Sequence, residues 1–591
     1  MQKLRLVVLR QIPEDPHLRQ QWNALVDQVD QPQVFYTYEW ALAVQRAYSA
    51  TLRPLLFLAY DEQATLSGVA ALATTPAGDE ASFLCATTGD YCDFLSLPGK
   101  QSAFVVEVLA ELRKQGIRNI TLTNLPADST TVAAIRQGAK RYHYHRFART
   151  AYVCSQVSLG ELERGEGGKP LLPRKKMVRR FLNAMGREAP VRIEHARSWD
   201  AVEPVLPQFM QTHVARFLFT QRISNMARAE RRAFLTELAK LLSGSGWLAL
   251  TRLLSGEKAL AWNYGFQFHG TWFWYQPTFD SDLEKYSPGF CLLTKLVEDA
   301  AENTALKTLD MGLGAEEYKD RLANHTRETL YVTLKSSVGA HLREIARNRA
   351  SAIVQRSPRV EVAARAMLAR LRRAQENFRH RGMGQNATWL GKRLRGLLWS
   401  KTEVYFYEWS GPTHSEPGAM KLRSLSLDQL AAATCRYVDD PATLTYLLRS
   451  AHRLRQGNVE GFALVDSAGK SVHFAWTSAF DGFFVAELNT KVDAPLAECV
   501  MLFDCWTPSA ERGQGHYGQA IALIAQEMTA RGKRPWIFSA GSNLSSIRGL
   551  EKSGFKRRYC LIWQRSLWWQ RVKGKTPIYS DVPAAEVSAR V

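Results

Sequence analysis

The sequence has no long apolar segment and no ordered pattern of cysteines. Its longest apolar runs, such as Leu55–Ala59, are the length of a strand, whereas a helix that crosses a bilayer needs about 20 apolar residues. The first ten residues hold too short an apolar segment for a secretory signal. The eight cysteines are scattered over 591 residues, without a C-x-x-C pair or the spacing of a zinc site. These absences predict a cytoplasmic protein with reduced cysteines and no metal.

The length and the charge predict several domains and one strongly basic segment. A chain of 591 residues with 46% hydrophobic and 23% charged residues is typical of a globular protein of roughly three or four domains. The net charge is +21, and about half of this excess lies between residues 340 and 400, where fourteen Arg and Lys stand against three Glu. Apolar residues recur there at helical spacing. We therefore expect residues 341–400 to form a basic amphipathic helical connector.

The stretch from Glu498 to Phe555 carries the clearest functional pattern. It predicts a strand over 498–507, a glycine-rich turn over 512–518, a helix to about residue 532, a strand over 535–540 and a helix from Asn543. Unpaired N–H groups at a helix start, with the positive end of the helix dipole, attract anions such as a diphosphate. Glycine at positions 513, 515 and 518 leaves room for phosphates to approach the backbone. The turn therefore predicts a diphosphate site, to which Arg512 can add a charge-assisted contact.

This stretch resembles the acyl-CoA-binding core of GNAT-family N-acetyltransferases. The loop of that family has Arg or Gln, two free positions, Gly, one free position, and then Gly or Ala. Arg512 and Gly515 match this pattern, while Tyr517 replaces the last small residue. Gly554-Phe555 keeps the family's later spacing. The resemblance implies that acetyl-CoA, or another acyl-CoA, binds here without a metal. The cofactor-binding residues it implies are Trp506, Thr507, Arg512, Gly513, Gln514, Gly515, His516, Tyr517, Gly518, Asn543 and Ser546.

Acyl transfer to an amine also needs a proton acceptor, and a proton donor assists the leaving thiolate. Asp504, on the strand before the loop, is our first candidate for the acceptor, followed by Glu498 and Glu487. A structural carboxylate is an equally good interpretation of Asp504. Many GNAT enzymes carry a tyrosine seven positions after the Asn, where this sequence has Leu550. Tyr517 or Tyr559 can take this role, or the thiolate leaves unassisted.

Residues 1–160 and 170–340 repeat one predicted order of elements: a strand meander, a helix, a strand, a helix and a strand. Their motifs are Phe35-Tyr36-x-Tyr38-x-Trp40, Gly89-Asp90-Tyr91, Tyr275, Asp280, Ser287-Pro288-Gly289 and Leu309-Asp310-Met311-Gly312-x-Gly314-x-x-x-Tyr318-Lys319. On these residues the segment from about 30 to 340 resembles the CelD family, which is linked to cellulose and exopolysaccharide synthesis and is related to FemAB-type transferases. Asp310 and Lys319 are candidate catalytic residues, although a structural salt bridge explains them equally well. Tyr275, Asp280 and Tyr318 are candidate substrate-binding residues.

Together these patterns predict an α/β fold of three tandem GNAT-like domains, whose mixed sheets are flanked by helices. A degenerate GNAT-like domain is expected at 1–160 and a CelD/FemAB-like acetyltransferase domain at 170–340. The connector at 341–400 is followed by a GNAT acyl-CoA-binding domain at 401–570 and a flexible tail at 571–591.

The function that the resemblances imply is acyl-CoA-dependent N- or O-acyl transfer. Its acceptor is a small molecule, or a glycan or lipid-linked precursor of the cell envelope or of an exopolysaccharide. Two alternatives stay open: aminoacyl transfer from an aminoacyl-tRNA, and a non-catalytic scaffold. The connector is interpreted either as a bracket between domains or as a surface that contacts anionic lipid at the inner face of the cytoplasmic membrane. No nucleic acid other than tRNA is expected as a partner.

Overall fold

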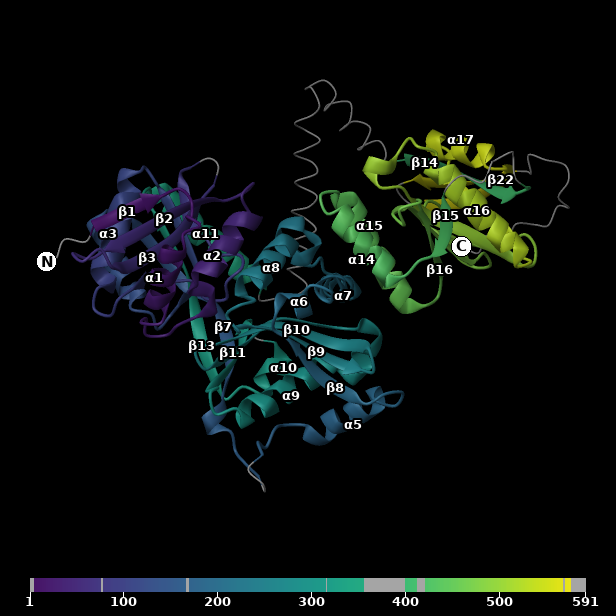
Figure 1. Cartoon of the computed structure of the whole chain (residues 1–591). Coiled ribbons are helices and arrows are strands. Elements are labelled where there is room, and N and C mark those ends of the chain that lie inside the picture. The colour runs from purple at the N-terminus through teal and green to yellow at the C-terminus, as the bar shows by residue number, and fades with distance from the viewer. Residues whose placement is uncertain are drawn as a thin grey trace. The chain divides into compact units, whose positions relative to one another are not determined.

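The computed structural model describes residues 5–75, 78–165, 169–314, 316–355, 399–411, 420–566 and 569–575. The chain forms two compact units (Figure 1). Unit 1 comprises residues 1–216 and 228–357, and unit 2 comprises residues 217–227 and 358–591. The sheet of unit 1 is mixed and is flanked by helices, as is that of unit 2, so the predicted α/β class is confirmed.

Unit 1 consists of two halves with the same order of elements, as the sequence predicts. Each half has an antiparallel meander, a helix that crosses to a parallel strand, a second helix and a last strand. The first half contains β1 (Arg5–Leu9), α1 (Pro16–Val26), α2 (Tyr38–Ala47), β2 (Arg53–Tyr60), β3 (Leu66–Thr74), β4 (Glu80–Phe83), β5 (Leu95–Ser96), α3 (Gln101–Lys114), β6 (Asn119–Pro126), α4 (Thr131–Arg141) and β7 (His145–Ser158). The second half contains α5 (Lys175–Met185), β8 (Val191–Ala196), α6 (Trp199–Val202), α7 (Leu206–Phe219), α8 (Ala229–Leu242), β9 (Leu248–Ser255), β10 (Lys258–Phe268), β11 (Thr271–Phe279), α9 (Pro288–Glu302), β12 (Thr308–Leu313), α10 (Glu317–Asp320) and β13 (His325–Lys335).

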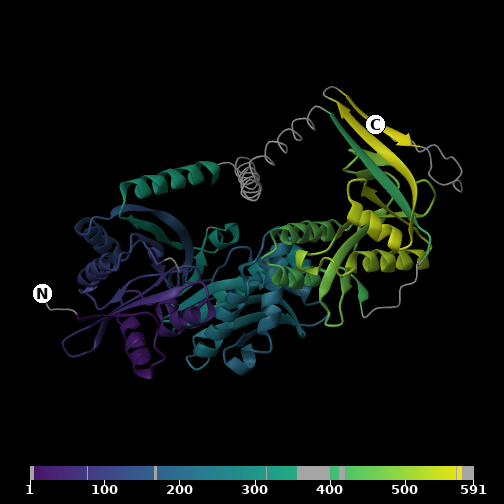
Figure 2. The same cartoon turned by 90° about the horizontal axis from the view of Figure 1, so that it is seen from above.

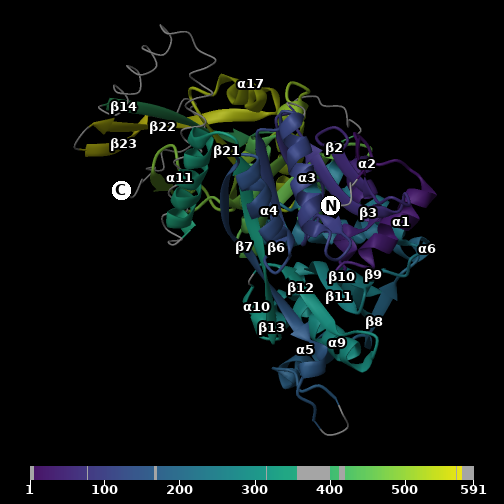
Figure 3. The ribbon, with the colours of Figure 1, turned by 90° about the vertical axis from the view of Figure 1, so that its left-hand side faces the viewer.

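The two halves exchange their last strands. The sheet runs β1-β2-β3-β4-β6-β13-β7-β12-β11-β10-β9-β8, with β5 paired to β3. Strand β13 of the second half thus lies next to β6 of the first, and β7 of the first half lies next to β12 of the second (Figure 3). Each half is completed by a strand of the other. The predicted division between 160 and 170 therefore falls inside one continuous sheet.

In both halves the only parallel pair of the described strands lies in the middle, and it is short. Strand β4 pairs with β6 from Glu80↔Asn119 to Ser82↔Thr121. Strand β11 pairs with β12 from Thr271↔Thr308 to Phe273↔Asp310. Beyond these pairs the two strands diverge. A parallel pair needs a crossover connection, which α3 and α9 supply.

Unit 2 has the plan of one half of unit 1, and here too one strand of the sheet is inserted out of chain order. Its sheet runs β15-β16-β17-β20-β21-β14-β22-β23, and β20 and β21 form its parallel pair. Strand β14 is inserted between β21 and β22, where β13 is inserted between β6 and β7 in unit 1. Figure 2 shows β14 as a long green strand beside the yellow β22. The elements are β14 (Trp399–Trp409), β15 (Lys421–Ser424), α14 (Leu427–Arg436), α15 (Pro441–Gln456), β16 (Glu460–Val465), β17 (Ser471–Ala479), β18 (Phe483–Val485), β19 (Thr490–Val492), β20 (Cys499–Trp506), α16 (His516–Ala530), β21 (Arg534–Ala540), α17 (Leu544–Lys552), β22 (Phe555–Ser566) and β23 (Trp569–Lys575).

Unit 2 has a separate hairpin, and one local prediction in this unit differs from the structure. Phe483–Val485 pairs with Thr490–Val492 outside the main sheet. Asn489 in its turn has a left-handed φ of 50°, which reverses the chain. The predicted flexible tail starts at 571, whereas β23 runs to Lys575 and pairs with β22. Residues 576–591 lie outside the described residues.

Only the beginning of the predicted connector is described. Helix α11 (Val338–Gln355) packs against the exchanged strands, since Tyr331 of β13 donates to Glu344 at 2.9 Å and Arg149 of β7 donates to Asn348 at 2.9 Å. The rest of the connector, residues 356–398, lies outside the described residues. Among the helices that the structure describes, none is both long and apolar enough to pass through a bilayer.

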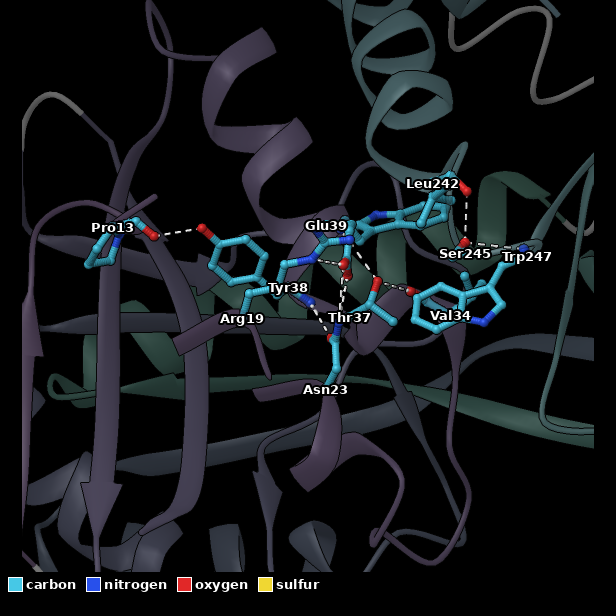
Figure 4. Close-up of polar contacts among 11 residues, drawn as sticks. Pro13, Arg19, Asn23, Val34, Thr37, Tyr38, Glu39, Leu242, Ser245 and Trp247 are labelled. Carbon is cyan, nitrogen blue, oxygen red and sulfur yellow. Dashed lines mark hydrogen bonds and ion pairs between the residues drawn. The ribbon is translucent and has the colours of Figure 1, made fainter. Parts of the chain in front are cut away.

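The aromatic motif at 35–40 joins helices α1 and α2 (Figure 4). Glu39 is 1% exposed, and its carboxylate accepts from Arg19 at 2.6 Å and from Asn23 at 3.0 Å. Tyr38 donates to the carbonyl of Pro13 at 2.6 Å, and the Thr37 hydroxyl to that of Val34 at 2.7 Å. These residues therefore hold the first half together.

Candidate functional site

The glycine loop, Arg512–Gly518, connects β20 to α16 and presents free backbone donors. Gly513 and Gly515 have φ of 82° and 81°, which residues with a Cβ rarely adopt, and open space lies where a Cβ would be. Gly515 is the N-cap of α16, and Gln519 makes the first bond of the helix, to the carbonyl of Gly515. Within the described part of the chain, the amide N–H groups of residues 513–518 make no hydrogen bond. The loop is thus a cluster of donors at a positive helix end.

A cleft of about 610 Å³ opens between β20 and β21, next to this loop. The two strands pair only from Cys499↔Arg534 to Leu502↔Ile537 and then diverge. The start of α17 closes the third side. The structure brings nine of the predicted cofactor-binding residues to the cleft wall: Trp506, Thr507, Arg512, Gly513, Gly515, His516, Tyr517, Asn543 and Ser546. Gln514 and Gly518 belong to the loop but not to the wall.

A β-bulge shapes the β20 side of the β20–β21 cleft. Phe503 pairs with Trp476 and Trp506 with Phe474, so Asp504 and Cys505 face the single residue Ala475. Asp504 has a left-handed φ of 46°. The bulge bends β20 where it leaves β21, and it breaks the backbone pairing beside the cleft.

Asp504, the first candidate for the proton acceptor, is bound by arginines of α15. Its carboxylate pairs with Arg453 and lies 3.8 Å from Arg449. Its carbonyl accepts from the hydroxyl of Tyr446 at 3.0 Å. These contacts fix the bulge to α15, and they occupy the carboxylate oxygens that would take a proton.

Of the other two carboxylates, Glu487 reaches the β20–β21 cleft and Glu498 does not. Glu487 is exposed in the β18–β19 turn and belongs to the cleft wall. Glu498 precedes β20 at its other end, is 60% exposed and pairs with Lys533, which lowers its pKa.

Tyr517 of α16 contacts α17, the helix that carries Leu550. Its hydroxyl lies 2.8 Å from that of Ser546 on α17, and burial raises its pKa. Its ring fills the space next to Gly549, where a Cβ would come within 2.7 Å. Leu550 is buried in the core of unit 2. The cleft therefore has a tyrosine on α16 in place of one on α17.

Two buried histidines lie beside the glycine loop, and one of them was not predicted. His473 of β17 is 1% exposed, and its Nδ1 lies 2.7 Å from the Thr507 hydroxyl. Burial, and the nearby His516, lower the pKa of His473 to about 3, so it is neutral at pH 7. His516 is 5% exposed, and both its ring nitrogens lack a partner among the described residues. The one signal for His473 in the sequence was a histidine inside an apolar strand.

The side chain of Arg512 stabilises the glycine loop through two contacts. Its Nε donates to the carbonyl of Thr507 at 3.1 Å, and its guanidinium lies 5.4 Å from the centre of the Trp506 ring. Asn543 caps α17, where its side chain accepts from the amide of Ser546 at 3.2 Å.

In unit 1 the candidates Asp310 and Lys319 have different partners. Asp310 is 2% exposed and accepts from Tyr91 and Gln156, each at 2.7 Å, and from the amide of Gly312 at 2.8 Å. Lys319 is also buried, and its ammonium donates to the carbonyl of Leu313 at 3.0 Å. The salt bridge, one of the two interpretations of this pair, does not form, because each side chain has its own network.

The three substrate-binding candidates of unit 1 are engaged within the fold. Tyr275 is buried and bonds to the Thr88 carbonyl and to Arg231. The Tyr318 hydroxyl accepts from Trp274 at 3.4 Å. Asp280 caps the short helix at 281–286 and pairs with Lys258 at 3.0 Å.

Asp90 was not among the candidate site residues, although it belongs to the motif Gly89-Asp90-Tyr91. It lies beside Asp310, where the two halves meet. Withdrawal from water and the neighbouring Asp310 carboxylate raise the pKa of Asp90 to about 7.

Residues 173–320 match the family model described as an acetyltransferase (GNAT) domain. This part of the chain is similar to GNAT acetyltransferases. Similar solved structures include L-PGS from Bacillus licheniformis (11% identity, 56% of this chain, 96% of that chain, TM-score 0.37). FemX is another (9% identity, 55% of this chain, 98% of that chain, TM-score 0.38). A third is the tandem GNAT protein from the clavulanic acid biosynthesis pathway (12% identity, 57% of this chain, 99% of that chain, TM-score 0.34). No curated protein matches the sequence.

The GNAT match supports an acyl-transfer function. It covers the second half of unit 1, from α5 to α10. Helix α9, the counterpart of α16 there, begins with Pro288, which has no N–H group, and a Cβ on Gly289 would come within 3.1 Å of Phe279. The glycine loop and the β20–β21 cleft, in contrast, lie in unit 2, beyond the GNAT match.

Proposed function

We propose that unit 2 binds an acyl-CoA, acetyl-CoA in the first instance, in the β20–β21 cleft and transfers its acyl group to an amine or a hydroxyl. The observation that carries this proposal is the run of unbonded amides at 513–518 beside an open cleft. Such a cluster at a helix start suits a diphosphate. The divergence of β20 from β21 gives an extended thioester a way through the sheet.

Each part of the cleft has a proposed task. Amides of the glycine loop, with the dipole of α16, hold the diphosphate, and Arg512 holds the loop in shape. Backbone N–H groups near the bulge at 504–507 stabilise the negative charge that develops on the acyl oxygen. Asn543 fixes the start of α17, so that Ser546 stays next to Tyr517.

Two side chains handle the protons in this proposal. The attacking nitrogen forms its bond to the acyl carbon while the bond from carbon to sulfur breaks. Glu487 takes the proton that the nitrogen loses, since its exposed carboxylate lies on the cleft wall, whereas Asp504 is occupied by Arg453 and positions the bulge. Tyr517 gives a proton to the leaving thiolate and regains one from water through Ser546.

The proposed acceptor is an amine or hydroxyl of a cell-envelope or exopolysaccharide precursor. This part rests on the resemblance of residues 30–340 to CelD-type proteins. An acyl-CoA donor is consistent with a reaction in the cytoplasm.

Calorimetric titration of the full-length protein with acetyl-CoA tests the proposal. Gly515→Asp places a carboxylate at the N-cap of α16, where it competes with a diphosphate for the same amides, so binding should be at least about tenfold weaker. Gly515→Asn is its uncharged counterpart. Gly532→Asp is a matched control, because Gly532 has a φ of 74° and open space around its Cβ but lies at the other end of α16. Absence of acetyl-CoA binding by the wild type contradicts the proposal.

The proton acceptor is tested separately. Glu487→Gln should lower the rate of thioester cleavage in the presence of an acceptor by about 100-fold, while acetyl-CoA binding is kept. Glu498→Gln, an exposed carboxylate outside the cleft wall, should change neither. A Glu487→Gln protein with wild-type turnover removes Glu487 from the mechanism.

A further inference from the structure

A second cleft lies in unit 1, where the exchanged strands bring the two halves together. This junction cleft has a volume of about 510 Å³ and is formed by the loops at 31–33 and 127–128, the end of β7, and the starts of β11, β12 and β13. It adjoins a further cleft of about 520 Å³ in the first half, with which it shares Gln31, Asp128 and Arg327. Its size is that of sites for small ligands.

The wall of the junction cleft is almost entirely polar. Pro32 and Ala127 are its only residues without a polar side chain, and polar surface predominates in it. The β20–β21 cleft differs in this respect, since Phe503, Trp506 and Phe538 line it. A ligand of the junction cleft must therefore be hydrophilic over most of its surface.

The charges of this wall favour a cation. Four carboxylates, Asp128, Glu161, Asp310 and Glu328, stand against the single guanidinium of Arg327. Arg327 is already engaged, since it pairs with Asp128 at 3.0 Å and lies 4.8 Å from the centre of the Tyr91 ring. The remaining carboxylates leave the cleft with an excess of negative charge.

A buried acceptor in the wall has no donor. Gln33 is 7% exposed, and its Oε1 has no hydrogen-bond partner among the described residues. Its Nε2 donates to the carbonyl of Gln31 at 3.4 Å, which fixes the orientation of the amide, because only the NH₂ group can donate to a carbonyl. A buried acceptor left unpaired is destabilising, so a ligand N–H or O–H would be bound favourably here.

We propose that the junction cleft binds a hydroxylated amine, of the chemical class of an amino sugar. Its ammonium group pairs with the carboxylates of Glu161 and Glu328, and one of its donors bonds to Oε1 of Gln33. The site belongs to unit 1 and does not depend on the function proposed for unit 2.

Ligand-observed NMR with the full-length protein and D-glucosamine tests this assignment, with D-glucose as the neutral analogue. Glucosamine should bind saturably, and glucose should bind at least about fivefold more weakly. Gln33→Leu should weaken glucosamine binding by about five- to a hundredfold, because it removes the unpaired acceptor. Glu161→Gln, at an exposed position that tolerates substitution, should weaken it about two- to fivefold.

The matched control is Glu163→Gln, since Glu163 is an exposed carboxylate two residues further on that is not in the cleft wall. It should bind glucosamine like the wild type. Equal binding of glucose and glucosamine overturns the proposal, as does an unchanged affinity in the Glu161→Gln protein. Absence of saturable glucosamine binding overturns it as well.

Discussion

The carboxylate of Asp90 lies against the backbone of Gly312. A Cβ placed on Gly312 would come within 2.5 Å of Asp90 Oδ2. Asp90 belongs to the first half of unit 1, whereas Gly312 lies in β12 of the second half, just beyond its last pair with β11. The GNAT half is thus in direct contact with a charged group that the other half supplies.

This contact predicts that Gly312→Ala is far more destabilising than its neighbour Gly314→Ala. Both glycines have left-handed φ angles, 70° and 95°, so each substitution should cost about 1–2 kcal/mol of backbone strain. At Gly312 the overlap with Asp90 adds about 1–3 kcal/mol, while nothing lies within 4 Å of a Cβ on Gly314. Urea denaturation of the two variants measures the difference. Equal losses would show that the Asp90 side chain moves aside.

Asp90 also predicts a dependence of stability on pH. Its pKa is about 7 in the folded protein and about 3.9 in an unfolded chain, so the folded state holds more protons between these values. The free energy of unfolding should therefore fall by at most about 4 kcal/mol, before solvent screening, as pH rises from about 4 to 7. Above pH 7 it should stay level. Asp93, whose pKa burial raises to about 6, adds to this fall over a narrower range.

Asp90→Asn should remove most of this slope. Relative to wild type, the variant should gain stability as pH rises from 4 to 7, because its amide cannot ionise. Denaturation at closely spaced pH values provides the measurement. Parallel curves for the two proteins would assign the slope to other groups.

A comparison of two tyrosine variants tests the proton donor proposed for unit 2. Tyr517→Phe should lower kcat by about 100-fold with little change in acyl-CoA binding, because the ring stays and only the hydroxyl next to Ser546 is lost. Tyr559→Phe is the matched control. Tyr559 is buried, stacks on Phe406 at 4.6 Å and is not in the cleft wall, although the sequence left it open as an alternative. Similar kinetics for both variants would mean that the thiolate leaves unassisted.

The sequence was sufficient for features that depend on local patterns. The order of elements in each half of unit 1 follows from hydrophobic periodicity, and the glycine loop from Gly513 and Gly515. Nine residues implied by the GNAT resemblance do line one cleft. The order of elements and the glycine loop could be predicted because each depends on residues close together in the chain.

Features that depend on distant pairing were not predictable. The exchange of β7 and β13 joins strands about 180 residues apart, and nothing in either strand specifies its partner. The bulge at Asp504 requires a left-handed φ, which an aspartate in the sequence does not by itself predict. The packing of the Tyr517 ring against Gly549 likewise depends on a contact between two helices that neither stretch of sequence specifies.

The buried carboxylate of Glu39 provides a last prediction, for the stability of the first half. Arg19 is 48% exposed and Glu39 1%, and their groups are 2.6 Å apart (Figure 4). Arg19→Ala should destabilise unit 1 by about 2–4 kcal/mol, because Glu39 keeps its charge with only Asn23 as a donor. Glu39→Gln in the Arg19→Ala background should restore part of the loss, since it removes that charge.

A double-mutant cycle of Arg19 and Glu39 measures the coupling energy of a buried ion pair, which can be compared with that of an exposed pair. We expect a coupling of about 1–3 kcal/mol, against less than about 1 kcal/mol for Arg192 and Glu257, which are 46% and 96% exposed at 3.1 Å. Both pairs lie in unit 1, so one unfolding transition reports on both. Because Arg19 is half-exposed, its own desolvation is small, and the coupling measures chiefly how burial of the Glu39 carboxylate strengthens the pair. Equal couplings for the two pairs would mean that the burial of Glu39 does not strengthen its interaction with Arg19.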